Sequence, residues 1–143
     1  MTWDARSRTR LLIAAIYAPF GVLHIVGSGG FLPIMPPIVP FPREVVIFTG
    51  LCEIAGAAGL LVPQTRRLAG IMLALYALCV WPANIYHAFS GVSAPPLPSS
   101  WWYHGPRLLL QPLFIWAPLW AGGVIHWPFG IRPSAAPPRP RGR

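Results

Sequence analysis

The sequence has very little charge for its length. Only 10% of its 143 residues are charged, lysine is absent, and the acidic residues number three. A soluble domain usually carries about 25% charged residues, so this composition excludes an ordinary solvated surface. Cysteine is scarce too, because Cys52 and Cys79 are the whole complement and form no C-x-x-C pair. That spacing argues against a thiol-disulfide exchanger, and no H-E-x-x-H or similar pattern predicts a metal site.

Long apolar stretches take the place of the missing charge. Hydrophobic residues make up 55% of the chain and the mean hydropathy is +0.55. Four runs approach the roughly 20 residues that cross a hydrocarbon core. They predict an all-α fold, a membrane four-helix bundle, with helices over about residues 11–27, 44–62, 67–89 and 107–126. Residues 11–127 would form one transmembrane domain after a basic N-terminus, residues 1–10. The Arg- and Pro-rich tail, residues 128–143, is expected to be disordered.

Arginine is distributed unevenly around these runs. Of the 11 basic residues, only Arg43 and Arg107 flank the helix ends opposite to the chain termini. The others lie beside the termini or in the short connection at 63–67. The positive-inside rule therefore predicts that both termini and this connection are cytoplasmic, in a bacterial inner membrane. We expect the arginines to meet anionic lipid headgroups rather than nucleic acid, because no foldable reader domain accompanies them.

The first apolar run has a second interpretation. Its basic flank and the small residues at 27–29 would also suit a cleaved signal peptide. Tyr17 and His24 within the run, and the even number of helices that it completes, favour a helix that is retained.

Proline dominates the two longer connections, residues 28–43 and 90–106. Proline fixes φ and removes a backbone donor, so stiff extended segments are expected there rather than helices. The tryptophans of the second segment suit the headgroup level, and we expect both segments to cover the outer end of the bundle. Solvated connectors are the alternative. His104 is expected to be exposed, while Pro112 and Pro118 should kink the fourth helix.

Glu53 is the most informative residue, since it is a lone carboxylate inside the second apolar run. An ionisable side chain at that depth is costly and normally faces a protein interior or a functional site. Other polar side chains fall in the same outer half of the membrane, judged from the helix directions and a rise of about 1.5 Å per residue. The predicted polar pocket consists of Glu53, His24, Asn84, His87 and Gln111, with Arg107 and Tyr86 at its rim. The same residues could instead serve helix packing alone.

The predicted helix that carries Glu53 contains several small residues. Gly50, Gly56 and Gly59 lie along it, and such residues let membrane helices approach one another closely. We therefore expect this helix to be central in the bundle. Cys52 and Cys79 fall at similar depth on the second and third helices, so a contact between them is conceivable.

Five short stretches occur in an order that is typical of one family. They are G-V-L-H at 21–24, P-I-V-P-F-P at 37–42, T-G-L-C-E-I-A-G at 49–56, P-Q-T-R-R-L-A at 63–69 and W-P-A-N-I-Y-H-A at 81–88. Together they resemble the DoxX-like family of small four-helix membrane proteins, over about residues 10–125. Glu53, His24, Asn84 and His87 match its motif positions, whereas Ile25 departs from the Phe that is common there. The resemblance implies the fold and a link to quinone-dependent or oxidative-stress systems, and it supplies no catalytic residues.

Two functions are consistent with these features. In the first, the protein is a small membrane subunit of a redox or oxidative-stress system, and its polar pocket binds a quinone or a similar lipophilic molecule. In the second, it is a non-enzymatic scaffold or assembly factor for a membrane protein partner or a second copy of itself. A small transporter is disfavoured, because four helices contain no evident inverted repeat. Whether the protein is an enzyme stays open.

Overall fold

The computed structural model describes residues 4–95 and 97–128, and all of its named elements are helices. The order is α1 (Ala5–Val26), α2 (Ser28–Phe31), the 3-10 helix η1 (Leu32–Ile34), α3 (Pro42–Leu61), α4 (Arg66–Phe89), α5 (Trp101–Leu109) and α6 (Gln111–Ala121). The all-α prediction is therefore confirmed for the described residues. Three of these helices, α1, α3 and α4, are long and apolar enough to cross a membrane. The predicted disorder of the tail concerns residues that lie almost wholly outside the described part.

The first helix begins earlier than the hydropathy predicted, at Ala5 rather than at residue 11. Asp4 is its N-cap, and one carboxylate oxygen accepts a hydrogen bond of 2.7 Å from the backbone N–H of Ser7. Such a cap satisfies a donor that the first turn would otherwise leave unpaired. Most of the basic N-terminus is consequently helical.

The expected single helix over residues 107–126 is wrong, because the structure has two shorter helices that meet at Leu110. Pro112 lies in the first turn of α6 and has no N–H, so it cannot donate to the carbonyl of Leu108 and continue α5. The predicted start of this helix at residue 107 was also wrong, because α5 begins at Trp101, within a segment that was expected to be extended. The first long connection likewise contains α2 and η1 where extended chain was expected.

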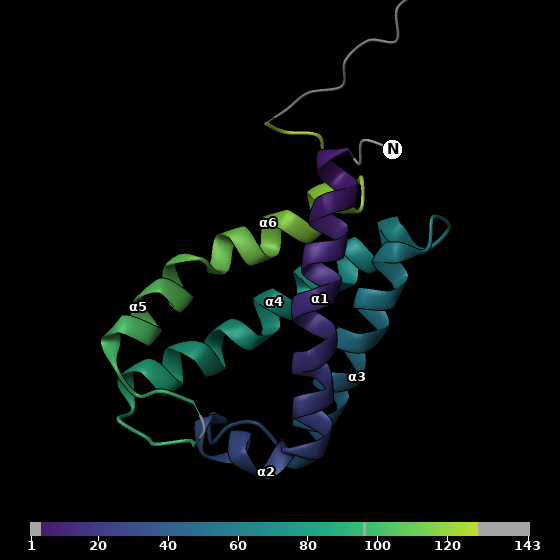
Figure 1. The fold of residues 1–143 in the computed structure, drawn as a ribbon. Helices are drawn as coiled ribbons and strands as arrows, with labels where there is room; N and C mark the ends of the chain where they lie inside the picture. Colours follow the sequence, from purple (N-terminus) through teal and green to yellow (C-terminus); the bar gives the residue numbers. More distant parts are fainter. Residues whose placement is uncertain (1–3, 96, 129–143) are drawn as a thin grey trace, which may run out of the picture.

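The long helices pack side by side in the order α1, α3, α4 and α6 (Figure 1). Helix α1 lies along α3, α3 packs against α4, and α4 packs against α6, which also contacts α1. The start of α1, the α3–α4 connection and the end of α6 lie toward one end of the molecule. Helices α2 and α5 lie away from that end, with the connection between α4 and α5 beside them. This arrangement agrees with the predicted alternation of helix directions.

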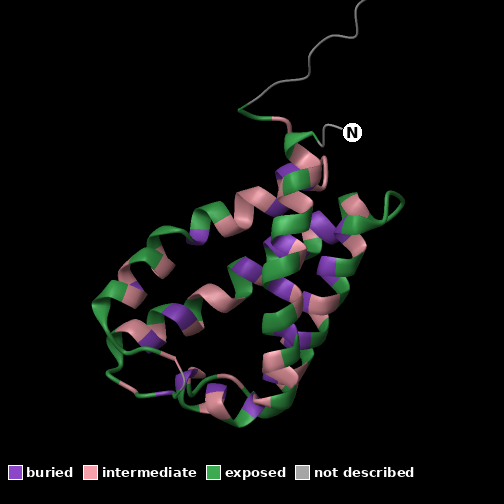
Figure 2. Ribbon diagram, in the orientation of Figure 1, coloured by how far each residue is buried: buried purple, intermediate pink, exposed green. Residues whose placement is uncertain are grey.

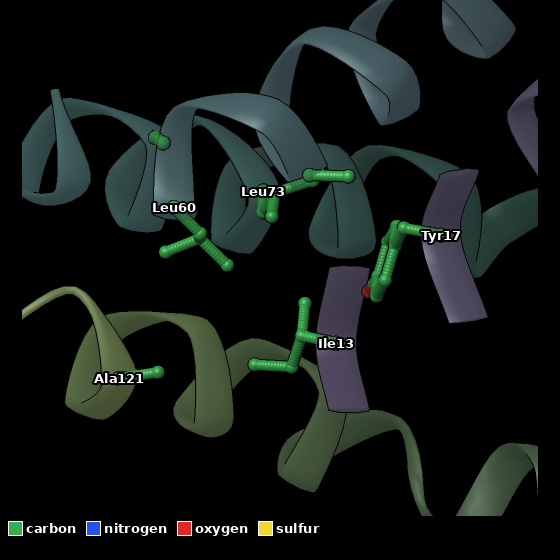
Figure 3. Close-up of a cluster of buried hydrophobic side chains, with 7 residues drawn as sticks. Ile13, Tyr17, Leu60, Leu73 and Ala121 are labelled. Carbon is green, nitrogen blue, oxygen red and sulfur yellow. The ribbon is translucent and has the colours of Figure 1, made fainter. Parts of the chain in front are cut away.

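One buried apolar cluster joins the four longest helices (Figure 3). Its members are Ile13, Tyr17, Ala57, Leu60, Ala69, Leu73 and Ala121, contributed by α1, α3, α4 and α6. Large apolar side chains are also exposed on the outer sides of these helices, where green segments recur in Figure 2. An apolar exterior of this kind is what a hydrocarbon surrounding requires.

Glycine permits very close contact between α1 and α3. An added Cβ on Gly50 would lie 2.6 Å from the carbonyl oxygen of Gly21, and one on Gly21 would lie 2.6 Å from the carbonyl oxygen of Gly50. No other residue fits at either position without separating the helices. The expectation that small residues let the helix of Glu53 approach its neighbours is confirmed here.

Two arginines of α1 hold the end of α6. Arg10 donates from Nη1 to the carbonyl oxygen of Ala121 at 3.1 Å, and Arg6 donates from Nη2 to that of Ile125 at 3.4 Å. The Arg6 guanidinium also lies 5.3 Å from the ring centroid of Trp120. A helix C-terminus carries partial negative charge and unpaired carbonyls, so these cations stabilise it.

Candidate functional site

His24 and Glu53 form the central contact of the site. His24 Nδ1 lies 2.5 Å from Glu53 Oε2, and the Glu53 residue is only 4% exposed. Each residue follows its helix's crossing glycine, Gly21 or Gly50, by three positions, which places both near the α1–α3 contact. A buried carboxylate requires such a partner, because its isolated charge would be strongly penalised. Both residues were predicted to belong to one polar pocket, and the structure adds that they contact each other directly.

A second polar contact joins α4 to α6. Asn84 donates from Nδ2 to Gln111 Oε1 at 3.1 Å, and Gln111 donates from Nε2 to the carbonyl oxygen of Ala77 at 2.5 Å. Both side chains are buried. These bonds satisfy the amide groups within the protein, as burial of polar groups demands. Asn84 and Gln111 therefore act first as a connection between helices.

Both polar contacts line one cavity of about 250 Å³, here called the chamber. Its polar lining comes from His24, Glu53, Tyr76, Asn84, Gln111, Arg107, Tyr17 and Tyr103. A second cavity of about 200 Å³, here called the side cavity, shares His24, Phe31, Tyr76, Val80, Asn84 and Arg107 with the chamber. Because so many residues border both, the two cavities adjoin one another.

Arg107 supplies the positive charge of the chamber. Its guanidinium lies 5.4 Å from the ring centroid of Tyr103, and its Nη1 atom is buried without a hydrogen-bond partner among the described residues. A buried donor of this kind is costly unless something accepts from it. The chamber therefore has a carboxylate–imidazole pair and a guanidinium side chain in its lining.

Tyr76 is the site residue that sequence reasoning missed. It lines the chamber and the side cavity, interacts with the Glu53 carboxylate, and packs edge-on against Tyr17 with ring centroids 5.9 Å apart. The signal was available, because residues 76, 80 and 84 recur at helical spacing on one face of α4. That spacing is a weak signal, because it places Tyr76 on the same face as Asn84 without showing what the face contacts.

His87 and Tyr86 do not join the predicted pocket, since neither lines the chamber. His87 is 1% exposed, and its ring centroid lies 4.6 Å from that of His104. His104 is itself buried, at 3% exposure, so the expectation of an exposed residue was wrong. The cause is α5, whose helical structure brings His104 against the end of α4.

The two cysteines are both free, Cys52 being partly buried and Cys79 exposed. Among residues 4–95 and 97–128, no group of three or more His, Cys, Asp or Glu side chains is placed to hold a metal ion. The conceivable contact between the cysteines has not produced a disulfide.

Comparisons with known proteins give one finding. No curated protein and no solved structure matches the chain. The resemblance to DoxX-like proteins stays a prediction, because none of these comparisons bears on it. A family model described as "Domain of unknown function (DUF8561)" matches residues 13–121. This match covers more than half of the chain and includes all the polar residues of the chamber. The chain is therefore a member of the DUF8561 family.

Proposed function

We propose that this is an integral membrane protein that binds a quinone or a similar lipophilic carbonyl compound in the chamber. The observation that carries the proposal is the lining of one cavity by the His24–Glu53 pair and by the Arg107 side chain. In this role the protein would be a small subunit of a redox or oxidative-stress system, as the resemblance to DoxX-like proteins also implies. The chemistry of electron transfer would belong to the partner.

The polar groups of the chamber suit a neutral acceptor. When His24 is protonated, it can donate from Nδ1 to Glu53 and from Nε2 to a ligand oxygen. Arg107 lines the same cavity from α5, so its guanidinium could serve a second carbonyl oxygen of the ring. The rest of the lining is mainly apolar or aromatic and would contact the ring itself. Glu53 then acts by orienting the His24 ring.

The topology that we propose places the chamber in the outer half of the membrane. Helices α5 and α6 together would make the fourth crossing, so that both termini are cytoplasmic in a bacterial inner membrane. The arginines at the start of α1 and in the α3–α4 connection would then meet anionic headgroups. Cysteine accessibility mapping from either side of sealed vesicles tests this orientation.

Photolabelling of the purified protein in nanodiscs with an azidoquinone tests the binding. Unlabelled quinone should protect the wild type, and Glu53→Gln should weaken protection about tenfold or more, since a hydrogen bond to a charged group contributes about 1.5–3 kcal/mol. Glu44→Gln is the matched control, because Glu44 is an exposed carboxylate in the first turn of the same helix. If the two variants are protected equally, the chamber does not bind the quinone through Glu53.

The second candidate function is a scaffold without a ligand. It is favoured by the Asn84–Gln111–Ala77 contacts, which join α4 to α6 within the protein. In that case Glu53→Gln would change the free energy of unfolding, and no quinone would protect the wild type from labelling.

A further inference from the structure

A third cavity lies between α3 and α4, and its lining is more apolar than that of the chamber. It has a volume of about 480 Å³ and is here called the groove. Small residues lie along its α3 side, namely Cys52, Ala55, Gly56 and Gly59, and larger apolar side chains border it, namely Phe48, Leu68, Met72 and Leu75. Four of the bordering residues, Phe48, Leu68, Met72 and Leu75, are exposed on the surface of the helices. In a membrane the groove would therefore open to the lipid.

The groove offers almost no polar groups to an occupant. The Thr49 hydroxyl donates to the carbonyl oxygen of Val46 at 2.7 Å, and the Thr65 hydroxyl donates to that of Gly59 at 2.9 Å. Both donors are thus used within the protein. An occupant of this groove has to be apolar along its length.

The groove adjoins the polar cavities, because residues in its lining also line them. Tyr76 lines the groove, the side cavity and the chamber, while Thr49 and Cys79 line both the groove and the side cavity. A molecule could therefore have a polar part beside His24 and an apolar part between α3 and α4. Along α3 the groove extends from Phe48 to Gly59, which is roughly 16 Å at a rise of about 1.5 Å per residue.

We infer that the groove holds the alkyl or isoprenoid tail of the molecule whose head occupies the chamber. This inference rests on the proposed function and specifies its ligand as a long-tailed amphiphile that enters sideways from the bilayer. The shared lining at Tyr76, Thr49 and Cys79 favours such a molecule over a second copy of the chain. A neighbouring helix would fill the apolar groove without placing any group in the chamber.

Two alanines of α3 allow a matched test. Ala55 and Ala58 are both exposed on the helix, but only Ala55 lines the groove. Binding of two benzoquinones with the same ring, one with a decyl tail and one without, is measured in nanodiscs of one composition. Ala55→Phe should weaken binding of the tailed compound at least fivefold and change binding of the tail-free compound less than twofold. Ala58→Phe should change neither value.

A second measurement uses the unaltered protein. Cys79 lines the groove and is exposed, so its reaction with a membrane-permeant maleimide should slow when the tailed compound is added. The tail-free compound, at a concentration that fills the chamber equally, should leave that rate unchanged. This readout does not depend on whether the Phe variant folds.

The failures of the two proposals can be distinguished. If neither benzoquinone binds the wild type, the proposed function fails and the tail inference fails with it. If both bind, but the tailed compound is insensitive to Ala55→Phe and does not protect Cys79, only the tail inference is overturned. A shift of oligomeric state in Ala55→Phe without any change in binding would identify the groove as an interface between copies and would also overturn it.

Discussion

Replacing Gly50 by Ala should disturb the His24–Glu53 contact by separating α1 from α3. The new methyl group would lie 2.6 Å from the carbonyl oxygen of Gly21 and 2.9 Å from Cβ of His24. Ordinary contact begins at 3.4 Å, so α1 and α3 have to separate by about 0.8 Å at the crossing. The obstacle is backbone, which cannot rotate away as the end of a side chain can.

The magnitude follows from two opposing effects. Overpacking of a tight contact costs about 1–3 kcal/mol, while Ala in place of a helical Gly contributes about 0.5–1 kcal/mol of stability. The net loss should be about 0–2.5 kcal/mol. The same separation would stretch the His24–Glu53 contact from 2.5 Å to about 3.3 Å, beyond the range of a strong hydrogen bond. Ligand protection should therefore weaken together with stability.

Reversible unfolding in mixed detergent micelles measures the first effect, and quinone protection from photolabelling measures the second. Gly105→Ala is the control, because nothing lies within 4 Å of an added Cβ at that position. It should be as stable as the wild type or up to about 1 kcal/mol more stable. If Gly50→Ala matches this control in both measurements, the α1–α3 crossing does not hold the pair in place.

Three further predictions use the same preparation. Gln111→Met should lower the free energy of unfolding by about 1–3 kcal/mol, because it removes both hydrogen bonds of the buried amide. The control Gln64→Met, at an exposed position, should change it by less than about 0.5 kcal/mol. Equal effects of the two substitutions would contradict a stabilising role of the Gln111 hydrogen bonds. Arg10→Gln should lower it by about 0.5–1.5 kcal/mol and speed amide exchange at the end of α6, whereas exposed Arg8→Gln should leave both unchanged. The Asp4 carboxylate accepts hydrogen bonds from Ser7 in the first turn of α1, and these lower its pKa below the ordinary value of 3.8. Its capping contribution is therefore complete above pH 3.8 and is lost as the pH falls through the pKa of the folded state. NMR helicity of that turn should decline only at such acid pH, and a constant value there would contradict the cap.

Position along the helices was predictable, because each apolar run is long and a helix has a fixed rise. That reasoning placed His24, Glu53, Asn84 and Gln111 in one layer, where they line the same chamber. It could not predict which of these residues contact one another, since that depends on the rotation of each helix about its axis. The structure pairs His24 with Glu53, and Asn84 with Gln111.

His87 illustrates what spacing alone leaves undecided. It lies three positions after Asn84 and was grouped with it on that account. One turn further along α4, however, the neighbour is α5 rather than the chamber, and His104 contacts the His87 ring. Helix α5 was not predicted, because prolines in residues 90–106 favoured extended chain and Pro106 lies inside the helix itself. Ser100, at the N-cap position, was the available signal for its start.

The arginine contacts at the end of α6 have a consequence for how the protein is made. Arg10 and its carbonyl partner at Ala121 are 111 residues apart in sequence. At about 5–20 residues per second, roughly 6–22 s of synthesis separate the two. Through that interval the α1 guanidiniums depend on water or lipid phosphate, and α4 has no α6 to cover Gly70. Closure of the helices is therefore a late event in biogenesis, and a chain that stops before α6 leaves the face of α4 around Gly70 uncovered.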